Sequence, residues 1–406
     1  MTWKYWTLSL IFISCVVDSC SSSSKSPSPS AASKTSSATS LVSALKYYNH
    51  FPFNNVYTLH LTIGAQNIEA VLDTGSSNLL VIGSEDYCSG CVNEYGYSSV
   101  YTPGTGSKEL SDSWAMSFAP IGQAQIQGYQ DTVSFEGDTL SSYSFGVATS
   151  EQGIPNIWGI AYAPVAQPAT DPLTPFFDAL VSKYNLKNEF SLSLCALKSG
   201  SSATFGGYDA DLAKLMAQVQ WTPVVAKSYY SISMTRMYVS AGTSDSSANP
   251  LWLWEPSNTD TVIIDSGTNP VVLPAQQVTG LVSVLQSLAT QKGVSIPASF
   301  WPTATAHGSY ASLSDADIAK FPNIYLDLVN FANSSQTFTL AISPSTYFQT
   351  REDGQRFFGV EAGSGIYILG TVFMENYIVL HDRGILSEAV DSTAKVGFYP
   401  IAGFCQ

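Results

Sequence analysis

The sequence predicts a mostly β protein whose two lobes face each other across a central cleft. Short apolar runs alternate with turns of Gly, Ser, Asn and Pro, which is typical of all-β domains. The chain has 406 residues, enough for two hydrophobic cores. Each half also contains an apolar strand that ends in an Asp-hydroxyl-Gly turn, at Asp73 and at Asp265. This repeat predicts two lobes related by a pseudo-twofold axis.

The first 45 residues read as a leader and a linker. Residues 1–19 carry Lys4 and an apolar run that is too short to span a membrane, so we expect a signal peptide. A lipoprotein anchor at Cys20 is the alternative. Residues 20–45 are mainly Ser, Ala, Thr, Pro and Lys, which predicts a disordered linker. No later run offers 18 apolar residues, so we expect no transmembrane anchor and a location that is secreted or in an acidic vacuolar or endomembrane lumen.

The first lobe is expected to span residues 46–196. Alternating apolar and polar residues predict half-buried strands, and continuous apolar runs predict buried ones. A segment flanked by Pro carries apolar residues at helical spacing and predicts a helix. The predicted strands are 56–63, 68–72, 78–82, 157–161 and 190–194, and the predicted helix covers 176–181.

The second lobe is expected to span residues 197–406 and to repeat the first. Apolar residues three and four apart predict the best helix of the chain, from Ala275 to Gln291. The run Ile366–Gly370 mirrors Ile157–Gly159 in the first lobe. The other predicted strands are 229–239, 262–265, 271–274, 324–331, 337–342, 377–382 and 395–399.

The charge narrows the class of partner. The net charge of −14 argues against nucleic acid, because its phosphates would be repelled. An acidic surface is compatible with work in acid, where many carboxylates are protonated, and equally with simple solubility.

Four cysteines lie beyond the leader. Cys88 and Cys91 have the spacing of a local disulfide or of half a zinc site. A structural zinc ion needs four ligands, and no second CxxC or nearby His is present, so we expect no metal. Cys195 and Cys405 are then left to pair with each other. Asn333 begins the only N-glycosylation sequon of the sequence.

The repeated Asp turn predicts chemistry if the two aspartates meet. Two carboxylates a few ångströms apart cannot both ionise cheaply, so they share one proton. Such a pair can activate one water molecule, with one carboxylate as base and the other as acid. We expect Asp73 to be the base and Asp265 the acid, although the shared proton makes this division a convention. The alternative is two ordinary turns, since Asp and Gly are common in turns.

These motifs resemble those of the pepsin-like aspartic peptidases, from about residue 46 to the end of the chain. Within that family the sequence is most similar to the memapsin, or β-secretase-like, branch. The resemblance rests on Asp73–Leu79, Asp265–Thr268, Trp158–Ala163, Ile368–Gly370, Pro175–Leu180, Phe190–Cys195, Phe205–Asp209 and Ser228–Tyr230.

The resemblance implies a monomeric aspartic endopeptidase that needs no cofactor and acts on polypeptides. It implies that Ser76 and Thr268 hydrogen-bond the outer carboxylate oxygens. It implies close backbone approach at Gly75 and Gly267. It also implies a disulfide between Cys195, just before the lobe boundary, and Cys405, near the C-terminus.

The sequence departs from the family in the hairpin around Trp114–Asp131, which the resemblance identifies as a flap over the cleft. A Tyr is expected in its first strand. Counting back from Asp131 without gaps puts Ala119 there, and a one-residue insertion puts Phe118 there, so the hydroxyl is absent and Phe118 becomes the candidate substrate contact. Leu80 stands where many members carry a Trp that partners this Tyr.

Two other classes of function stay open. A catalytically impaired homologue could act as a binding or inhibitor protein, for which the missing flap Tyr is the support. A carbohydrate-binding β protein is supported by the Trp content alone.

Overall fold

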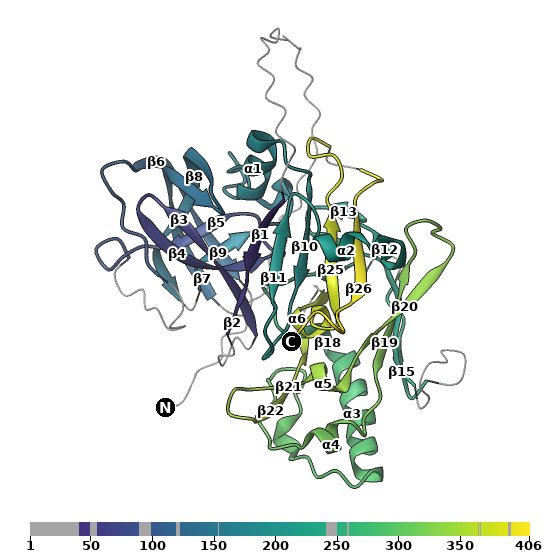
Figure 1. Ribbon diagram of the computed structural model, residues 1–406. Coiled ribbons are helices and arrows are strands. Elements are labelled where there is room, and N and C mark those ends of the chain that lie inside the picture. Colours follow the sequence, from purple (N-terminus) through teal and green to yellow (C-terminus); the bar gives the residue numbers. More distant parts are fainter. Residues whose placement is uncertain are drawn as a thin grey trace. The chain divides into compact units, whose positions relative to one another are not determined.

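The computed structural model describes residues 40–48, 55–88, 99–118, 122–152, 154–240, 250–257, 260–363, 365, 367–388 and 391–406. The chain divides into two units, residues 1–37 and 38–406, and the described residues belong to the second. The predicted signal peptide, Cys20 and most of the predicted linker therefore lie outside the described residues, as do Cys91 and Ala119. The second unit is mostly β, which confirms the predicted class (Figure 1).

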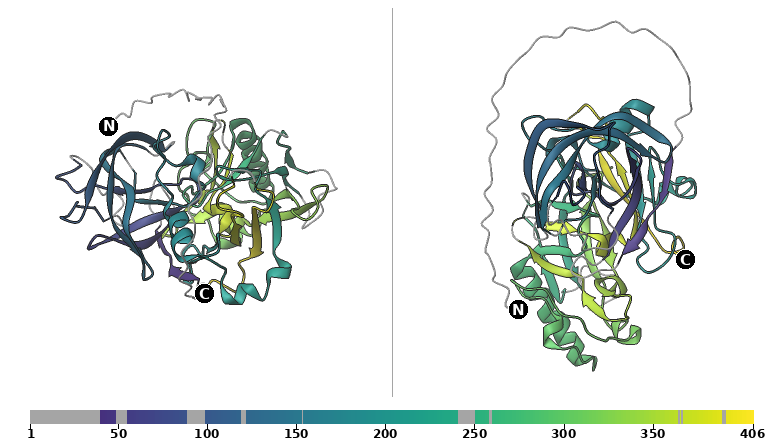
Figure 2. Two further views of the ribbon diagram at one scale, coloured as in Figure 1. Left: turned by 90° about the horizontal axis from the view of Figure 1, so that it is seen from above. Right: turned by 90° about the vertical axis from the view of Figure 1, so that its left-hand side faces the viewer.

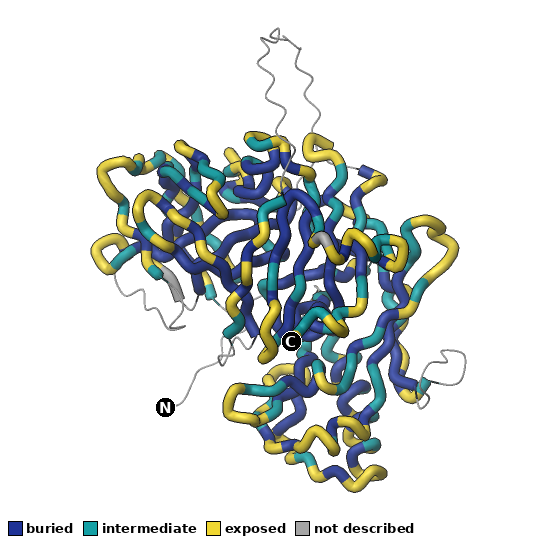
Figure 3. The backbone as a smooth tube through the Cα atoms, in the orientation of Figure 1, coloured by how far each residue is buried: buried dark blue, intermediate teal, exposed yellow. Residues whose placement is uncertain are grey.

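The first half forms an eight-stranded sheet in the order β2-β3-β4-β9-β5-β8-β7-β6, in which β3 also pairs with β7. The apolar faces of the central strands pack on each other, and β3, β4, β5 and β9 are buried over most of their length (dark blue in Figure 3), whereas β2 and β6 contain no fully buried residue. The strands are β2 (Lys46–Tyr48), β3 (Val56–Ile63), β4 (Gln66–Asp73), β5 (Leu79–Ile82), β6 (Lys108–Phe118), β7 (Gly122–Phe135), β8 (Asp138–Gln152) and β9 (Ile157–Gly159).

A six-stranded sheet combines strands from both halves, in the order β1-β11-β10-β25-β26-β12. Strand β25 lies between β10 and β26 in this sheet, and the yellow C-terminal strands lie among teal segments in both views of Figure 2. The predicted lobe boundary after residue 196 falls between β10 and β11, which are neighbours in this sheet. The division of the chain at this residue therefore stays a proposal. The strands are β1 (Leu41–Ala44), β10 (Glu189–Ser193), β11 (Ser202–Phe205), β12 (Gln220–Pro223), β25 (Tyr377–Asp382) and β26 (Lys395–Pro400).

Strand β1 corrects the predicted extent of the linker, which was placed at residues 20–45. Leu41 pairs with Phe205 and Ala44 with Ser202, and the following Leu45 is buried. The Ser-rich composition around this strand predicted a linker. The strand forms because β11, which is far away in the sequence, satisfies its backbone groups. The ordered body therefore begins before residue 46.

The second half contains three further sheets, with orders β13-β14-β17-β24-β18-β23, β16-β15-β19-β20 and β21-β22. Their strands are β13 (Ala226–Lys227), β14 (Tyr230–Ile232), β15 (Met234–Val239), β16 (Trp252–Trp254), β17 (Val262–Ile264), β18 (Val271–Pro274), β19 (Ile324–Val329), β20 (Thr337–Ile342), β21 (Phe348–Thr350), β22 (Arg356–Phe358), β23 (Val360–Gly363) and β24 (Tyr367–Leu369).

The helices are few, and the longest is the one that the sequence predicts best. Helix α3 (Ala275–Gln291) has the predicted bounds, and its apolar stripe, including Val278, Leu281 and Leu285, is buried. The other helices are α1 (Phe176–Tyr184), α2 (Ala210–Ala213), α4 (Asp315–Ile318), α5 (Pro344–Tyr347), α6 (Thr371–Met374), η1 (Ala163–Val165), η2 (Met216–Gln218) and η3 (Ala298–Phe300). None of the described helices is both long and apolar enough to cross a membrane.

The two halves repeat one arrangement of four strands. In the first half β4 is parallel to β9, β9 is antiparallel to β5, and β5 is parallel to β8. In the second half β17, β24, β18 and β23 are related in the same directions. The predicted pseudo-twofold repeat is therefore present in the strand pairing.

Candidate active site

Asp73 and Asp265 occupy equivalent places in this repeat. Asp73 is the last residue of β4 and pairs with Gly159, while Asp265 directly follows β17. Both are buried, at 7% and 8% exposure. An apolar strand therefore delivers each carboxylate into a site with little water, where an unpaired charge would be costly.

The turn after each aspartate holds its carboxylate with the same two kinds of donor. The Gly75 N–H donates to Asp73 Oδ1 at 2.7 Å, and the Gly267 N–H donates to Asp265 Oδ1 at 2.8 Å. The other oxygen accepts from a hydroxyl three residues on. Ser76 Oγ donates to Asp73 Oδ2, and Thr268 Oγ1 donates to Asp265 Oδ2 at 2.7 Å. Ser76 and Thr268 thus bind the carboxylates as the resemblance implied, and the N–H groups of Gly75 and Gly267 add two hydrogen bonds that were not predicted.

The residues between each Asp and Gly bind the two halves together. Thr74 Oγ1 donates to the Ile264 carbonyl at 3.0 Å and accepts from the Ser266 N–H at 2.8 Å. Ser266 Oγ donates to the Leu72 carbonyl at 2.6 Å and accepts from the Thr74 N–H at 3.1 Å. Both hydroxyl residues are fully buried. Four reciprocal hydrogen bonds therefore fix the two turns against each other.

The two glycines show how closely the turns meet. A Cβ added to Gly75 would lie 2.5 Å from Asp265 Oδ2, and one added to Gly267 would lie 2.3 Å from Asp73 Oδ1. Neither distance is possible for a real side chain. Each glycine therefore leaves the space that the carboxylate of the opposite half occupies.

Burial raises the pKa of Asp73 well above its usual range, and the charge of Asp265 raises it further. The hydrogen bonds from Ser76 and Gly75 oppose this change, because they stabilise the ionised form. The pair consequently retains a proton at pH values where an isolated Asp has lost it.

Tyr229 is a neighbour of the pair that sequence reasoning did not single out as a site residue. It is half-buried, and its pKa is raised by burial and then by the charges of Asp265 and Asp73. The signal was available, because Tyr229 lies within a segment that carries the family resemblance, but it has no motif spacing of its own.

The hairpin that the resemblance identifies as the flap is formed by β6 and β7. Trp114, Met116 and Phe118 alternate along β6 with exposed residues and pack on a cluster that contains Leu80 and Ile126. The indole N–H of Trp114 is buried and has no hydrogen-bond partner among the described residues. Phe118 therefore lies on the face of the hairpin that packs on this cluster.

The remaining residues predicted from the sequence lie outside the two aspartate turns. The structure contains the Cys195–Cys405 disulfide, with a Cα–Cα distance of 5.4 Å. Cys88 is disulfide-bonded and buried, but its predicted partner lies outside the described residues, so that pairing stays a prediction. Asn333 is exposed between β19 and β20. No group of three potential metal ligands occurs among the described residues.

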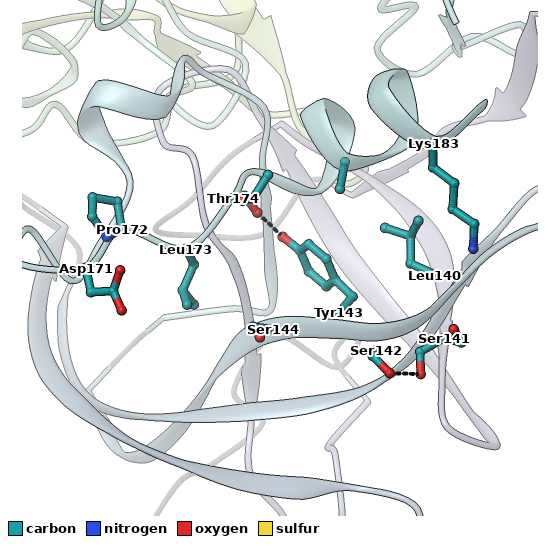
Figure 4. Close-up of a pocket in the computed structure, with 11 residues that line it drawn as sticks. Leu140, Ser141, Ser142, Tyr143, Ser144, Asp171, Pro172, Leu173, Thr174 and Lys183 are labelled. Carbon is teal, nitrogen blue, oxygen red and sulfur yellow. Dashed lines mark hydrogen bonds between the residues drawn. The ribbon is translucent and has the colours of Figure 1, made fainter. Parts of the chain in front are cut away.

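A pocket of about 510 Å³ lies where β8 meets the segment before α1 (Figure 4). The Tyr143 hydroxyl donates to the Thr174 carbonyl there, at 2.7 Å. None of the predicted site residues lines this pocket, so we give it no part in the chemistry.

Comparison with known proteins connects this geometry to one family. The profile of the eukaryotic aspartyl proteases matches residues 56–389. The β-secretase of Strongylocentrotus purpuratus is 28% identical over 365 residues, which cover 80% of this chain and 64% of that protein. Pepsin A of Gallus gallus is 26% identical, covering 85% of this chain and 83% of its own length. Gastricsin of Rattus norvegicus is 25% identical, with coverages of 81% and 78%. The alignment thus spans less than two thirds of the β-secretase.

Proposed function

The chain belongs to the eukaryotic aspartyl protease family, and we propose that it is an endopeptidase that hydrolyses polypeptides with a water molecule held between Asp73 and Asp265. The observation that carries the proposal is the matched set of hydrogen bonds at the two carboxylates, together with the close approach of each glycine to the opposite aspartate. This arrangement supplies two carboxyl groups and one shared proton at a single point.

The reaction would proceed by general acid–base catalysis. The ionised carboxylate removes a proton from the water as the water attacks the peptide carbonyl, and the protonated carboxyl donates its proton to the carbonyl oxygen. As the resulting tetrahedral diol collapses, the C–N bond breaks, the nitrogen takes the proton that the pair gained from the water, and one diol hydroxyl returns its proton to the other carboxylate. The raised pKa of Asp73 supports a proton shared by the pair before attack, and the division into acid and base stays a convention.

The substrate would be an extended polypeptide added as a strand between the flap hairpin and the two turns. On the flap side it would meet Phe118 and the neighbouring apolar side chains, with no hydroxyl at the predicted Tyr position. We also propose that the protein is a monomer that enters the secretory route by residues 1–19 and is secreted or kept in an acidic lumen.

The test is digestion of a casein-like substrate from pH 3 to pH 7, with and without a statine-type inhibitor. We expect internal cleavage confined to acid or mildly acid pH and suppressed by the inhibitor. Wild-type protein that binds the inhibitor but cleaves nothing would support the impaired homologue instead, and a rate maximum above pH 8 would contradict a shared-proton pair.

A further inference from the structure

Glu375 is a buried carboxyl group that the proposed reaction does not use. It directly follows α6 and is 8% exposed. A carboxylate in such a place is unfavourable unless hydrogen bonds or a cation compensate for its lost hydration.

The hydrogen-bond donors to Glu375 come from the other half of the chain. The Tyr57 hydroxyl donates to Glu375 Oε1 at 2.8 Å, and Asn55 Nδ2 donates to the same oxygen at 3.2 Å. Tyr57 and Asn55 are both buried, at 0% and 2% exposure. The Tyr57 hydroxyl in turn accepts from the Ala196 N–H at 2.8 Å. The carboxyl group therefore joins the two halves at a second place, apart from Thr74 and Ser266.

Asn55 also connects this place to the turn of Asp265. The Thr371 hydroxyl donates to the Asn55 carbonyl at 3.3 Å and accepts from Asn269 Nδ2 at 3.0 Å. The Thr371 N–H donates to the Thr268 carbonyl at 2.9 Å. Thr268 is the residue whose hydroxyl binds Asp265. A continuous buried path thus runs from Glu375 to the second turn, and it gives Asn269, which the turn motif alone does not explain, a definite contact.

The environment of Glu375 makes its charge sensitive to pH. Burial raises its pKa from 4.5 to about 7, against the opposing hydrogen bonds of Tyr57 and Asn55. The Tyr47 hydroxyl donates a hydrogen bond to Asn55 Oδ1, and its charge, after burial and the charge of Glu375, contributes to the raised pKa of Tyr57. None of Tyr57, Asn55 and Tyr47 is a cation, so their hydrogen bonds offset only part of the cost of burying the ionised carboxylate.

We propose that Glu375, Asn55 and Thr371 form a tie between the two halves that holds the Asp265 turn in place, and that the buried position of Glu375, with no cation among its described contacts, makes the folded state less stable when Glu375 ionises. The link to catalysis rests on the proposed function, because it requires Asp265 to be catalytic. The effect on the fold does not.

The sign of the effect follows from the direction of the pKa change. Because the folded protein binds this proton more tightly than the unfolded chain, its stability falls as the pH rises from about 4.5 to about 7. Glu375→Gln keeps an oxygen acceptor for Tyr57 and Asn55 but cannot ionise. At pH 7.5 we expect Glu375→Gln to have a folded-to-unfolded ratio at least about tenfold above that of the wild type. At pH 4.5 we expect the two to be equal.

Thermal and urea unfolding at both pH values measure this without any substrate. The matched control is Glu388→Gln, which removes an exposed carboxylate and should follow the wild type at both pH values. Equal loss of stability at pH 7.5 in the wild type and in Glu375→Gln would overturn the tie, whether or not the protein cleaves peptides.

The connection to the turn needs a kinetic measurement. Thr371→Val removes the hydroxyl between Asn55 and Asn269, and we expect kcat to fall severalfold at pH 4.5 with little change in KM. Thr279→Val removes an exposed hydroxyl of α3 and should change neither. If Thr371→Val lowers the unfolding temperature and leaves kcat unchanged, the tie does not position Asp265. If the wild type itself is inactive, the proposed function fails while the unfolding result still decides the tie.

Discussion

The turn at Asp73 and the turn at Asp265 reach the same geometry from different surroundings. Asp73 ends the eight-residue strand β4, whereas Asp265 follows β17, which has three residues. Both carboxylates nevertheless accept one glycine N–H and one hydroxyl. The geometry is thus set by the four-residue turn and its cross-half contacts, and not by the length of the strand that leads to it.

The halves differ in what lies four residues after each aspartate. Ser77 donates to the Tyr162 carbonyl at 2.6 Å, within the first half. Asn269 instead binds Thr371, which reaches Asn55 in the other half. At this position the first turn is therefore held within its own half, whereas the second is linked to the opposite half. The mutations below test how far the two turns are equivalent and where they part.

Loss of either carboxylate should have the largest effect. Asp73→Asn and Asp265→Asn each remove the shared proton or the base, so we expect kcat to fall by at least about 10³-fold in both. Kinetics with a casein-like peptide at pH 4.5 measure this, and Asp353→Asn, at an exposed position, is the control. Retained activity in one of the two variants would show that the turns are not a pair.

Replacing Gly75 or Gly267 with alanine should cause the second largest loss of activity. A Cβ at Gly75 or Gly267 would overlap the carboxylate of the other half, so we expect the pair to separate and activity to fall about 100-fold. Gly104→Ala is the control, because a Cβ there meets nothing within 4 Å. A normal rate for Gly75→Ala or Gly267→Ala would mean that the carboxylates do not meet as described.

The pair of aspartates could be predicted from the sequence because each lies in a local motif of four residues after an apolar strand. The bounds of α3 followed from apolar spacing alone. The bonds between Thr74 and Ser266, the strand β1 and the contacts of Glu375 could not be predicted, since each depends on a partner far away in the sequence and none has a periodic pattern. The Ser-rich composition around Leu41 instead favoured a disordered linker.

The cross-half hydroxyls should contribute equally to stability. Thr74→Val and Ser266→Ala each leave a buried N–H and a buried carbonyl without a partner. We expect each to lower the free energy of unfolding by about 1–3 kcal/mol, as measured by urea denaturation. A large loss in one variant and none in the other would break the equivalence of the turns.

The smallest effect should separate the two outer hydroxyls. Removing the Ser76 hydroxyl takes a hydrogen bond away from ionised Asp73 and so raises the pKa of Asp73 further. Ser76→Ala should therefore move the alkaline limb of the pH profile of kcat/KM to higher pH, with less than about a tenfold change in its maximum. Thr268→Ala removes the matching hydrogen bond at Asp265, and the larger of the two shifts identifies the carboxylate that holds the shared proton. A larger shift in Thr268→Ala would place the shared proton on Asp265 instead.

The shared proton can be observed directly by ¹³C NMR of protein labelled at the Asp carboxyl carbon, recorded from pH 3 to pH 8 for the wild type and for Asp265→Asn. We expect the Asp73 signal of the wild type to stay at the position of a protonated carboxyl well above pH 4. In Asp265→Asn it should titrate at lower pH, because the neighbouring charge is gone. An Asp73 signal that titrates identically in both proteins would contradict the pair.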